Sequence, residues 1–195
     1  MGEIDYHIIN RAMTGLENEC GDIGVVREYE GHCFIGLIDV LGHGKEAFDV
    51  ACLASAYLLD HYEQGLEEIM NGLHAHLANT RGAVAFICRL DLTTGVLSYS
   101  GIGNITVRRF GSKIERLVSK NGILGYMNIS PMEKQVKLYP GDILVLSSDG
   151  VKEHFNVDDY PEILMGNARN ISAGFLEQLG KTNDDASCIA LRYGI

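Results

Sequence analysis

Residues 36–51, with the sequence GLIDVLGHGKEAFDVA, constrain the fold of this chain more than any other stretch. The apolar run that leads into it predicts a buried strand that ends in a carboxylate, Asp39. A turn with two glycines follows, and a strongly amphipathic helix is expected to begin near Lys45. A carboxylate at the end of a buried strand, beside a glycine-bracketed histidine and a helix N-terminus, suits work on anions or metals.

Strand and helix patterns account for the rest of the chain. Apolar residues recur with helical spacing after Gly44 and again after Gly65, so two consecutive helices are expected to cover one surface. Weaker helical patterns occur at 159–166 and 170–180. Apolar runs between turn residues predict strands at 4–9, 23–30, 32–40, 83–91, 96–100, 104–110, 113–118, 132–138, 142–147 and 187–193.

Strands grouped with paired helices, without strict alternation, indicate an α+β fold with mainly antiparallel sheets. The four strands predicted between residues 83 and 118 are interpreted as an antiparallel meander, because glycine-containing turns separate them. The strands are too many for one half-covered sheet, so we expect two sheets packed face to face and flanked by helices. No linker, repeat or low-complexity segment interrupts the pattern, which predicts a single domain over residues 1–195.

The composition excludes several classes of function. The chain of 195 residues has a formal net charge of −10, with 16 Lys and Arg scattered among 26 Asp and Glu, which argues against binding nucleic acid or an anionic membrane. No apolar run approaches the ~20 residues of a membrane span, and the N-terminus lacks a signal-peptide pattern. A cytoplasmic protein is expected, and its five cysteines, which form no CxxC pair, are interpreted as reduced thiols.

Carboxylates recur at the ends of predicted strands. Asp39 and Asp149 each end an apolar run, Asp184 and Asp185 precede the last strand, and Asp22 lies in a turn beside a strand. Each alone is an ordinary turn residue. Two carboxylates ~4 Å apart repel by about 4 kcal/mol at an effective dielectric constant of 20, so a cluster of them needs a cation. Oxygen ligands without a His or Cys cluster point to Mg²⁺ or Mn²⁺, on the hypothesis that these side chains converge.

Three motifs carry a resemblance to a known family. DVLGHGKEA before a long helix, GDILVLSSDGVKE, and NDDAS before a terminal strand resemble, in this order, the signatures of the PPM-type metal-dependent Ser/Thr protein phosphatases. The likeness is strongest to their bacterial, SpoIIE-like branch and spans about residues 18–192. It implies two packed β-sheets flanked by helices. The short chain, without a sensor module, is most similar to the RsbX-type feedback phosphatases of the stressosome.

The resemblance assigns a role to each carboxylate. It implies that Asp39 bridges two metal ions, Mn²⁺ or Mg²⁺. It implies that Asp149 and Asp184 are ligands of one ion and that Asp22 serves the other side of the site. Asp185 is either a further ligand or a residue that supports the ligands.

Two positions leave alternatives open. The family has glycine where this chain has Val40, whose backbone carbonyl is expected to be a metal ligand. If the backbone there requires a positive φ, a β-branched residue is strained and the second ion is weakened. His43 is either the general acid for the leaving serine oxygen or a turn residue that fixes the loop.

The resemblance implies hydrolysis of phosphoserine or phosphothreonine by a water held between two ions. The expected partners are phosphorylated STAS-domain proteins of a stressosome-like complex, and the chain is expected to be a monomer. One alternative is a phosphatase for an anti-sigma-factor antagonist. Another is a catalytically silent module that binds STAS partners, which the departure at Val40 keeps open.

Overall fold

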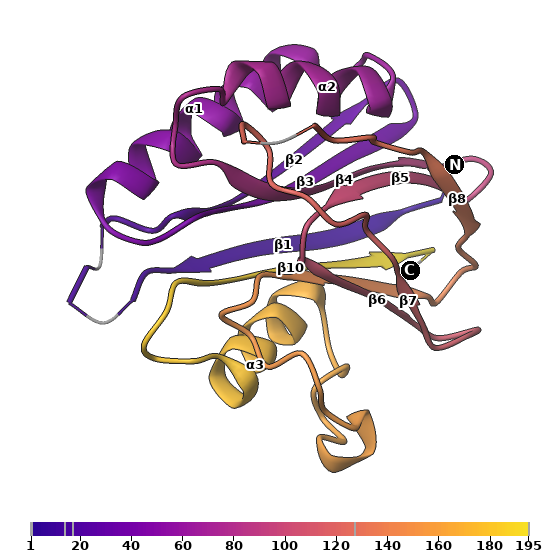
Figure 1. Ribbon diagram of the computed structural model, residues 1–195. Helices are drawn as coiled ribbons and strands as arrows, with labels where there is room; N and C mark the ends of the chain where they lie inside the picture. The colour runs from indigo at the N-terminus through magenta and orange to yellow at the C-terminus, as the bar shows by residue number, and fades with distance from the viewer. Residues whose placement is uncertain (1, 14, 17, 127, 195) are drawn as a thin grey trace.

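The computed structural model describes residues 2–13, 15, 16, 18–126 and 128–194, which form two stacked five-stranded sheets between helices (Figure 1). The first sheet has the order β2 (Asp22–Tyr29), β3 (His32–Val40), β4 (Ala83–Asp91), β5 (Val96–Ile102) and β8 (Lys134–Lys137). The second has the order β1 (Ile4–Arg11), β10 (Ala186–Tyr193), β9 (Ile143–Ser147), β6 (Thr106–Phe110) and β7 (Glu115–Leu117). The helices are α1 (Lys45–His61), α2 (Leu66–His76), α3 (Ala168–Leu179) and the short 3₁₀ helix η1 (Val157–Asp159).

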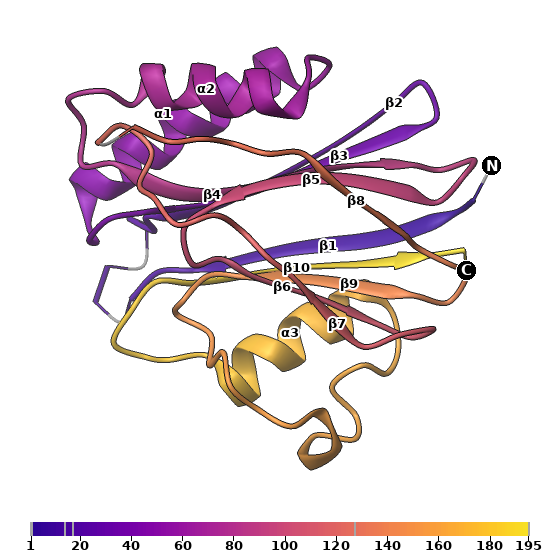
Figure 2. The same ribbon diagram turned by 45° about the vertical axis from the view of Figure 1, so that its right-hand side comes forward.

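The predicted fold class is confirmed. Each pairing between the named strands is antiparallel, α1 and α2 cover the outer face of the first sheet, and α3 covers that of the second (Figures 1 and 2). In the described part of the chain no helix has the length and hydrophobicity needed to cross a bilayer.

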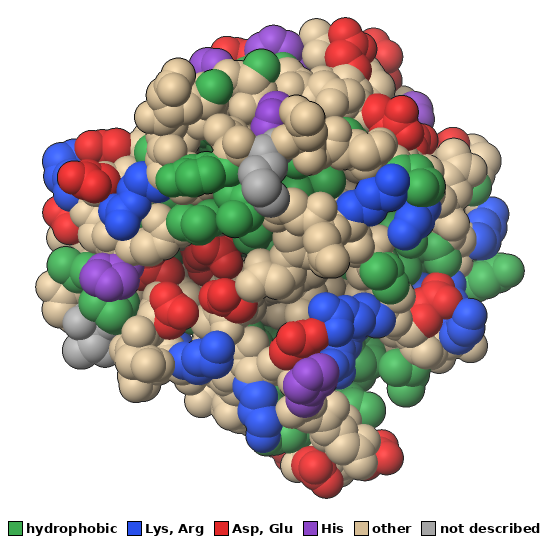
Figure 3. All heavy atoms as spheres, in the orientation of Figure 1, with side chains coloured by type: hydrophobic (Ala, Val, Ile, Leu, Met, Phe, Trp, Pro, Cys, Tyr) green, Lys and Arg blue, Asp and Glu red, His purple; other side chains and the backbone are tan. Residues whose placement is uncertain are grey.

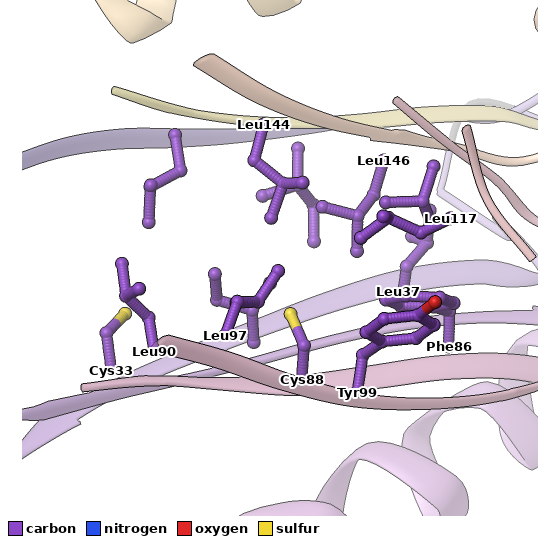
Figure 4. Packing of buried hydrophobic residues seen from close by; sticks show 14 of the residues in the cluster. Cys33, Leu37, Phe86, Cys88, Leu90, Leu97, Tyr99, Leu117, Leu144 and Leu146 are labelled. Atoms are coloured by element: carbon purple, nitrogen blue, oxygen red, sulfur yellow. The ribbon is translucent and has the colours of Figure 1, made fainter. Parts of the chain in front are cut away.

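Strand β3 shows why an uninterrupted apolar run folds as a buried strand. Its side chains alternate between faces, so Cys33, Ile35 and Leu37 enter the core between the sheets, while Phe34 and Ile38 pack under α1 and α2. Figure 4 shows the first of these cores, where Leu residues of the second sheet meet Cys33, Leu37 and their neighbours. Both faces of β3 are therefore sealed, and its end is held rigidly.

The predicted meander over residues 83–118 is wrong. Strands β4 and β5 pair in the first sheet and β6 and β7 pair in the second, so the chain changes sheets between β5 and β6. The change occurs at Gly103, which has a φ of +101° and has the side chain of Val84 packed where a Cβ would lie. Turn residues mark where a strand ends, but they do not encode which sheet the next strand joins.

The helix predicted at 159–166 is also wrong. Only η1 forms there, capped by the Asn156 side chain, and turns follow it. Tyr160 has φ −133° and ψ 66° because the ring of Pro161 disfavours helical backbone in the residue before it. The second weak pattern is confirmed as α3. Among the cysteines, Cys33, Cys88 and Cys188 are buried as free thiols.

Candidate metal centre

The topology brings the predicted carboxylates to one end of the sandwich. Asp22 begins β2 and Asp39 is the second-last residue of β3, and the two lie directly opposite each other in the ladder. Asp149 follows β9 by two residues, and Asp184 lies just before β10. Strands β9 and β10 pair with Ser147 opposite Cys188, so the end of one meets the start of the other. The strand pairings therefore bring these four carboxylates to the same end of the sandwich.

The carboxylates share one cavity with a volume of about 820 Å³. Its lining includes Asp39, Asp149, Asp184 and Asp185 together with the loop at Val40. Figure 3 shows acidic side chains gathered in a hollow on this face, with hydrophobic side chains along its upper edge. Asp22 lies behind this surface and is only 4% exposed.

A serine holds the buried Asp22. The Ser148 hydroxyl donates to Oδ2 of Asp22 at 2.5 Å and accepts the backbone N–H of Ser187 at 3.0 Å. Ser148 therefore links Asp22 of β2, in the first sheet, to Ser187 of β10, in the second sheet. This contact fixes the orientation of the Asp22 carboxylate. The sequence reasoning missed this residue, although it stands directly before Asp149 in the SSD motif.

The pKa values of the carboxylates reflect their burial and their mutual repulsion. Burial, followed by the charge of Asp22 and of two other carboxylates, raises the pKa of Asp39 from 3.8 to about 9. Burial also raises the pKa of Asp22 to about 7, although the hydrogen bond from Ser148 opposes part of the rise. For Asp184, burial and then the charge of Asp149 raise the pKa. Without a bound cation, the folded protein therefore holds a proton on Asp39 at neutral pH.

Asp149 is oriented from two sides. The Asn104 side-chain amide donates to its Oδ2 at 3.1 Å, and Lys181 Nζ donates to its backbone carbonyl at 2.6 Å. Asn104 follows the glycine at which the chain changes sheets, and Lys181 immediately follows Gly180, the residue that caps α3. The lysine was also missed, because a basic residue three positions before Asp184 has no distinctive spacing.

Asp185 differs from the other acids. Its two carboxylate oxygens accept the backbone N–H groups of Gly21 at 2.6 Å and Met13 at 2.7 Å, and the residue is 4% exposed. Both oxygens are thus engaged in fixing the segment that leads into β2. Of the two roles left open for Asp185, support of the ligands is the one that these contacts favour.

The donor chemistry fits a hard divalent cation, since the clustered side chains offer carboxylate oxygens. Within the described residues, however, no three His, Cys, Asp or Glu side chains already stand at ligand positions around a common point. Burial, and then the charge of the neighbouring carboxylates, raises the pKa of Asp39, so a bound cation would favour its ionised form.

The structure removes the concern about Val40. Among the described non-glycine residues, only Glu30 and Asn79 have a positive φ, so valine at the end of β3 is unstrained. The turn is made instead by Gly42 and Gly44, with φ of +84° and +78°. His43 between them is exposed and is not one of the described residues that line the cavity, so its predicted catalytic role stays a prediction.

The family model of stage II sporulation protein E (SpoIIE) matches residues 29–194. The chain belongs to the SpoIIE family. No curated protein matches its sequence. Membership of this family, with the phosphatase fold of the solved structures described below, confirms the prediction that the chain is a protein phosphatase.

Three solved structures illustrate the fold of this SpoIIE-family protein. One, described as the bacterial stressosome, a modular system adapted to control secondary messenger signaling, is 30% identical, with a TM-score of 0.87 over 97% of this chain and 100% of that one. RsbX in complex with magnesium is 18% identical, with a TM-score of 0.84 over 99% and 98%. The catalytic domain of the serine/threonine protein phosphatase PstP with two manganese ions is 11% identical, with a TM-score of 0.76 over 100% of both. The likeness to RsbX concerns the fold, so the closer RsbX-type assignment stays a prediction.

Proposed function

We propose that this SpoIIE-family protein is a metal-dependent serine/threonine phosphatase that acts on phosphorylated STAS-domain proteins of a stressosome-like complex. The convergence of Asp22, Asp39, Asp149 and Asp184 at one end of the sandwich is the observation that carries the proposal. The stressosome context of a structure that is 30% identical over nearly the whole chain supports the choice of substrate.

In this proposal Asp39, Asp149 and Asp184 would hold one ion, and Asp39, Asp22 and the carbonyl of Val40 would hold the other. When bound, Mg²⁺ or Mn²⁺ ions supply a water that loses its proton near neutral pH and positive charge that offsets the phosphoryl oxygens. The PstP neighbour contains two manganese ions, and the RsbX neighbour contains magnesium.

The residues around the carboxylates preorganise the site. Ser148 and Asn104 each donate a hydrogen bond to one carboxylate, to Asp22 and Asp149 respectively, and so fix which oxygen remains available. Asp185 fixes the segment that carries Asp22 through two backbone hydrogen bonds. Holding the acids in place before a ligand arrives avoids paying for their reorganisation during the reaction.

The test is dephosphorylation of a serine-phosphorylated STAS-domain protein and of p-nitrophenyl phosphate, each with Mn²⁺, Mg²⁺ or EDTA. We expect activity with a divalent ion that EDTA abolishes and that Asp149→Asn lowers by at least about a hundredfold, as expected for loss of a group that acts on the transition state. Asp60→Asn, an exposed aspartate on α1, is the matched control and should retain wild-type activity. Binding of the STAS protein without hydrolysis under any metal condition would overturn the proposal in favour of a silent binding module.

A further inference from the structure

The cavity extends well beyond the carboxylates. Its other wall is formed by the segment after β7, which contributes Val118, Ser119 and residues 121–123. Backbone hydrogen bonds tie this segment to the first sheet, from Lys120 N–H to the Gly101 carbonyl at 2.9 Å and from Leu124 N–H to the Ala83 carbonyl at 2.8 Å. The wall is therefore a preformed part of the site, and the volume of about 820 Å³ is large enough for several residues of a bound peptide.

One residue of this wall differs in charge from the rest. Among the described residues that line the cavity there are five acidic side chains, and Arg116 of β7 alone is cationic. Its Nη1 forms an ion pair with Oε1 of Glu153, and the Arg116 side chain remains 43% exposed. A phosphoprotein is an anionic substrate, so Arg116 is the point on this wall that can attract it.

The ion pair is held by its surroundings. Arg108, opposite Arg116 in the ladder, donates to the backbone carbonyl of Glu153 and lies with its guanidinium 4.5 Å from the centre of the Phe155 ring. Glu153 follows Asp149 by four residues in the same loop. The hairpin of β6 and β7 thus fixes the position of Arg116 relative to the carboxylate end of the cavity.

The strand register sets the separation between the two ends. Arg116 pairs with Arg108, Arg108 pairs with Val145, and Asp149 lies four residues past Val145. With a rise of about 3.3 Å per residue and strands about 4.8 Å apart, the backbones of Arg116 and Asp149 are roughly 15 Å apart. Arg116 therefore lies at the end of the cavity away from the carboxylates. It is placed to meet a residue near the phosphorylated one, because extended chain spans about 3.3–3.6 Å per residue.

We propose that Arg116 is a specificity-determining residue that binds a carboxylate on the substrate about two to four residues from the phosphoserine. The inference rests on the proposed phosphatase function and deepens it by naming an acidic phosphopeptide segment as the preferred substrate. Glu153 competes for the same guanidinium and keeps it oriented while no substrate is bound.

The experiment compares phosphoserine peptides that carry either Glu or Gln three residues before or three residues after the phosphoserine. The measured quantity is the ratio of kcat/KM for the Glu peptide to that for its Gln match. A charged hydrogen bond contributes about 1.5–3 kcal/mol, so we expect a ratio of about ten or more at one of the two positions in the wild type. Arg116→Gln should reduce that ratio to about one, and Arg116→Glu should favour a peptide with Lys at the same position.

Two further variants separate recognition from folding. Glu153→Gln should raise the ratio, because it removes the internal competitor and a repulsive charge while leaving Arg116 in place. Arg169→Gln, an exposed arginine on α3, should leave the ratio at its wild-type value. A wild-type ratio near one at both positions, or a high ratio that survives Arg116→Gln, would overturn the proposal.

Binding distinguishes failure of this inference from failure of the proposed function. Fluorescence anisotropy of the labelled Glu and Gln phosphopeptides with the EDTA-treated protein reports recognition without turnover. A preference that depends on Arg116, found in a protein without phosphatase activity, would uphold the recognition and refute the phosphatase. Metal-dependent hydrolysis without any preference in either assay would uphold the phosphatase and refute the recognition by Arg116.

Discussion

Replacing Asp39 by Asn should stabilise the metal-free protein at neutral and alkaline pH. Asp39 lies directly opposite Asp22 in the β2–β3 ladder, which places their Cβ atoms about 4.5–5.5 Å apart. Two charges about 5 Å apart repel by about 3 kcal/mol at an effective dielectric constant of 20. In the folded, metal-free protein, burial and this repulsion keep Asp39 protonated at neutral pH, so Asp39→Asn removes the cost of holding that proton without opening a cavity, because asparagine has nearly the same shape.

The sign of the pH dependence follows from the raised pKa. The folded protein holds a proton on Asp39 up to a pKa of about 9, while the unfolded chain releases it near 3.9. Stability from this group is thus fully present below the unfolded pKa and is lost as the pH rises through the folded one. One proton of difference gives a slope of about 1.4 kcal/mol per pH unit. Between pH 5 and pH 7, the free energy of unfolding of the wild type should fall by about 2–3 kcal/mol relative to that of Asp39→Asn.

The measurement is urea unfolding in EDTA at several pH values between 5 and 8, with Asp60→Asn as the control for loss of one exposed carboxylate. Excess Mn²⁺ should reverse the order, because only the wild type gains substantially from binding; at a hundred times Kd the gain is about 2.7 kcal/mol. Parallel pH profiles for the wild type and Asp39→Asn in EDTA would show that Asp39 is not held in the repulsive cluster, and the electrostatic argument would fail.

Three further substitutions test the surroundings of the site. Ser148→Ala removes the hydrogen bond to Asp22 and should raise the Mn²⁺ concentration for half-maximal activity about tenfold, whereas an unchanged metal titration would show that Ser148 does not position Asp22. Val40→Gly should lower the free energy of unfolding by about 2–4 kcal/mol in a thermal or urea melt, because buried surface and backbone rigidity are lost. It should leave metal affinity unimproved, and a tighter second ion would restore the argument for strain at Val40. His43→Ala should change kcat less than about twofold, because the ring is exposed outside the described lining of the cavity; loss of the alkaline limb of the pH–rate profile would instead identify a general acid.

Local features of the sequence were sufficient to predict most of the strands, the main turn and the positions of the carboxylates. Strand β3 could be predicted because a strand that is buried on both faces must be apolar throughout. The turn after Asp39 could be predicted because it contains glycines, which adopt a positive φ there. The carboxylates could be found because each stands where an apolar strand begins or ends.

Features that depend on contacts between distant segments could not be read in this way. The hydroxyl of Ser148 reaches Asp22 across 126 positions of sequence, and Asp185 uses both oxygens on backbone groups more than 160 positions away. A serine beside an aspartate gives no sign of its partner, and a second aspartate beside Asp184 reads as another ligand. The roles of Ser148 and Asp185 depend on which distant segments the fold brings together, and the periodicity of the sequence does not show this.

The change of sheet at Gly103 links these missed features to the function. Because β6 joins β9 and not β5, Asn104 reaches Asp149 and β7 becomes the edge strand that carries Arg116. The segment after β7 then returns to the first sheet and closes the wall of the cavity. A simple meander over the same residues would have left β6 and β7 in the first sheet, away from β9. The crossing is thus the feature that places the Arg116 side chain and the acidic centre at opposite ends of one cavity.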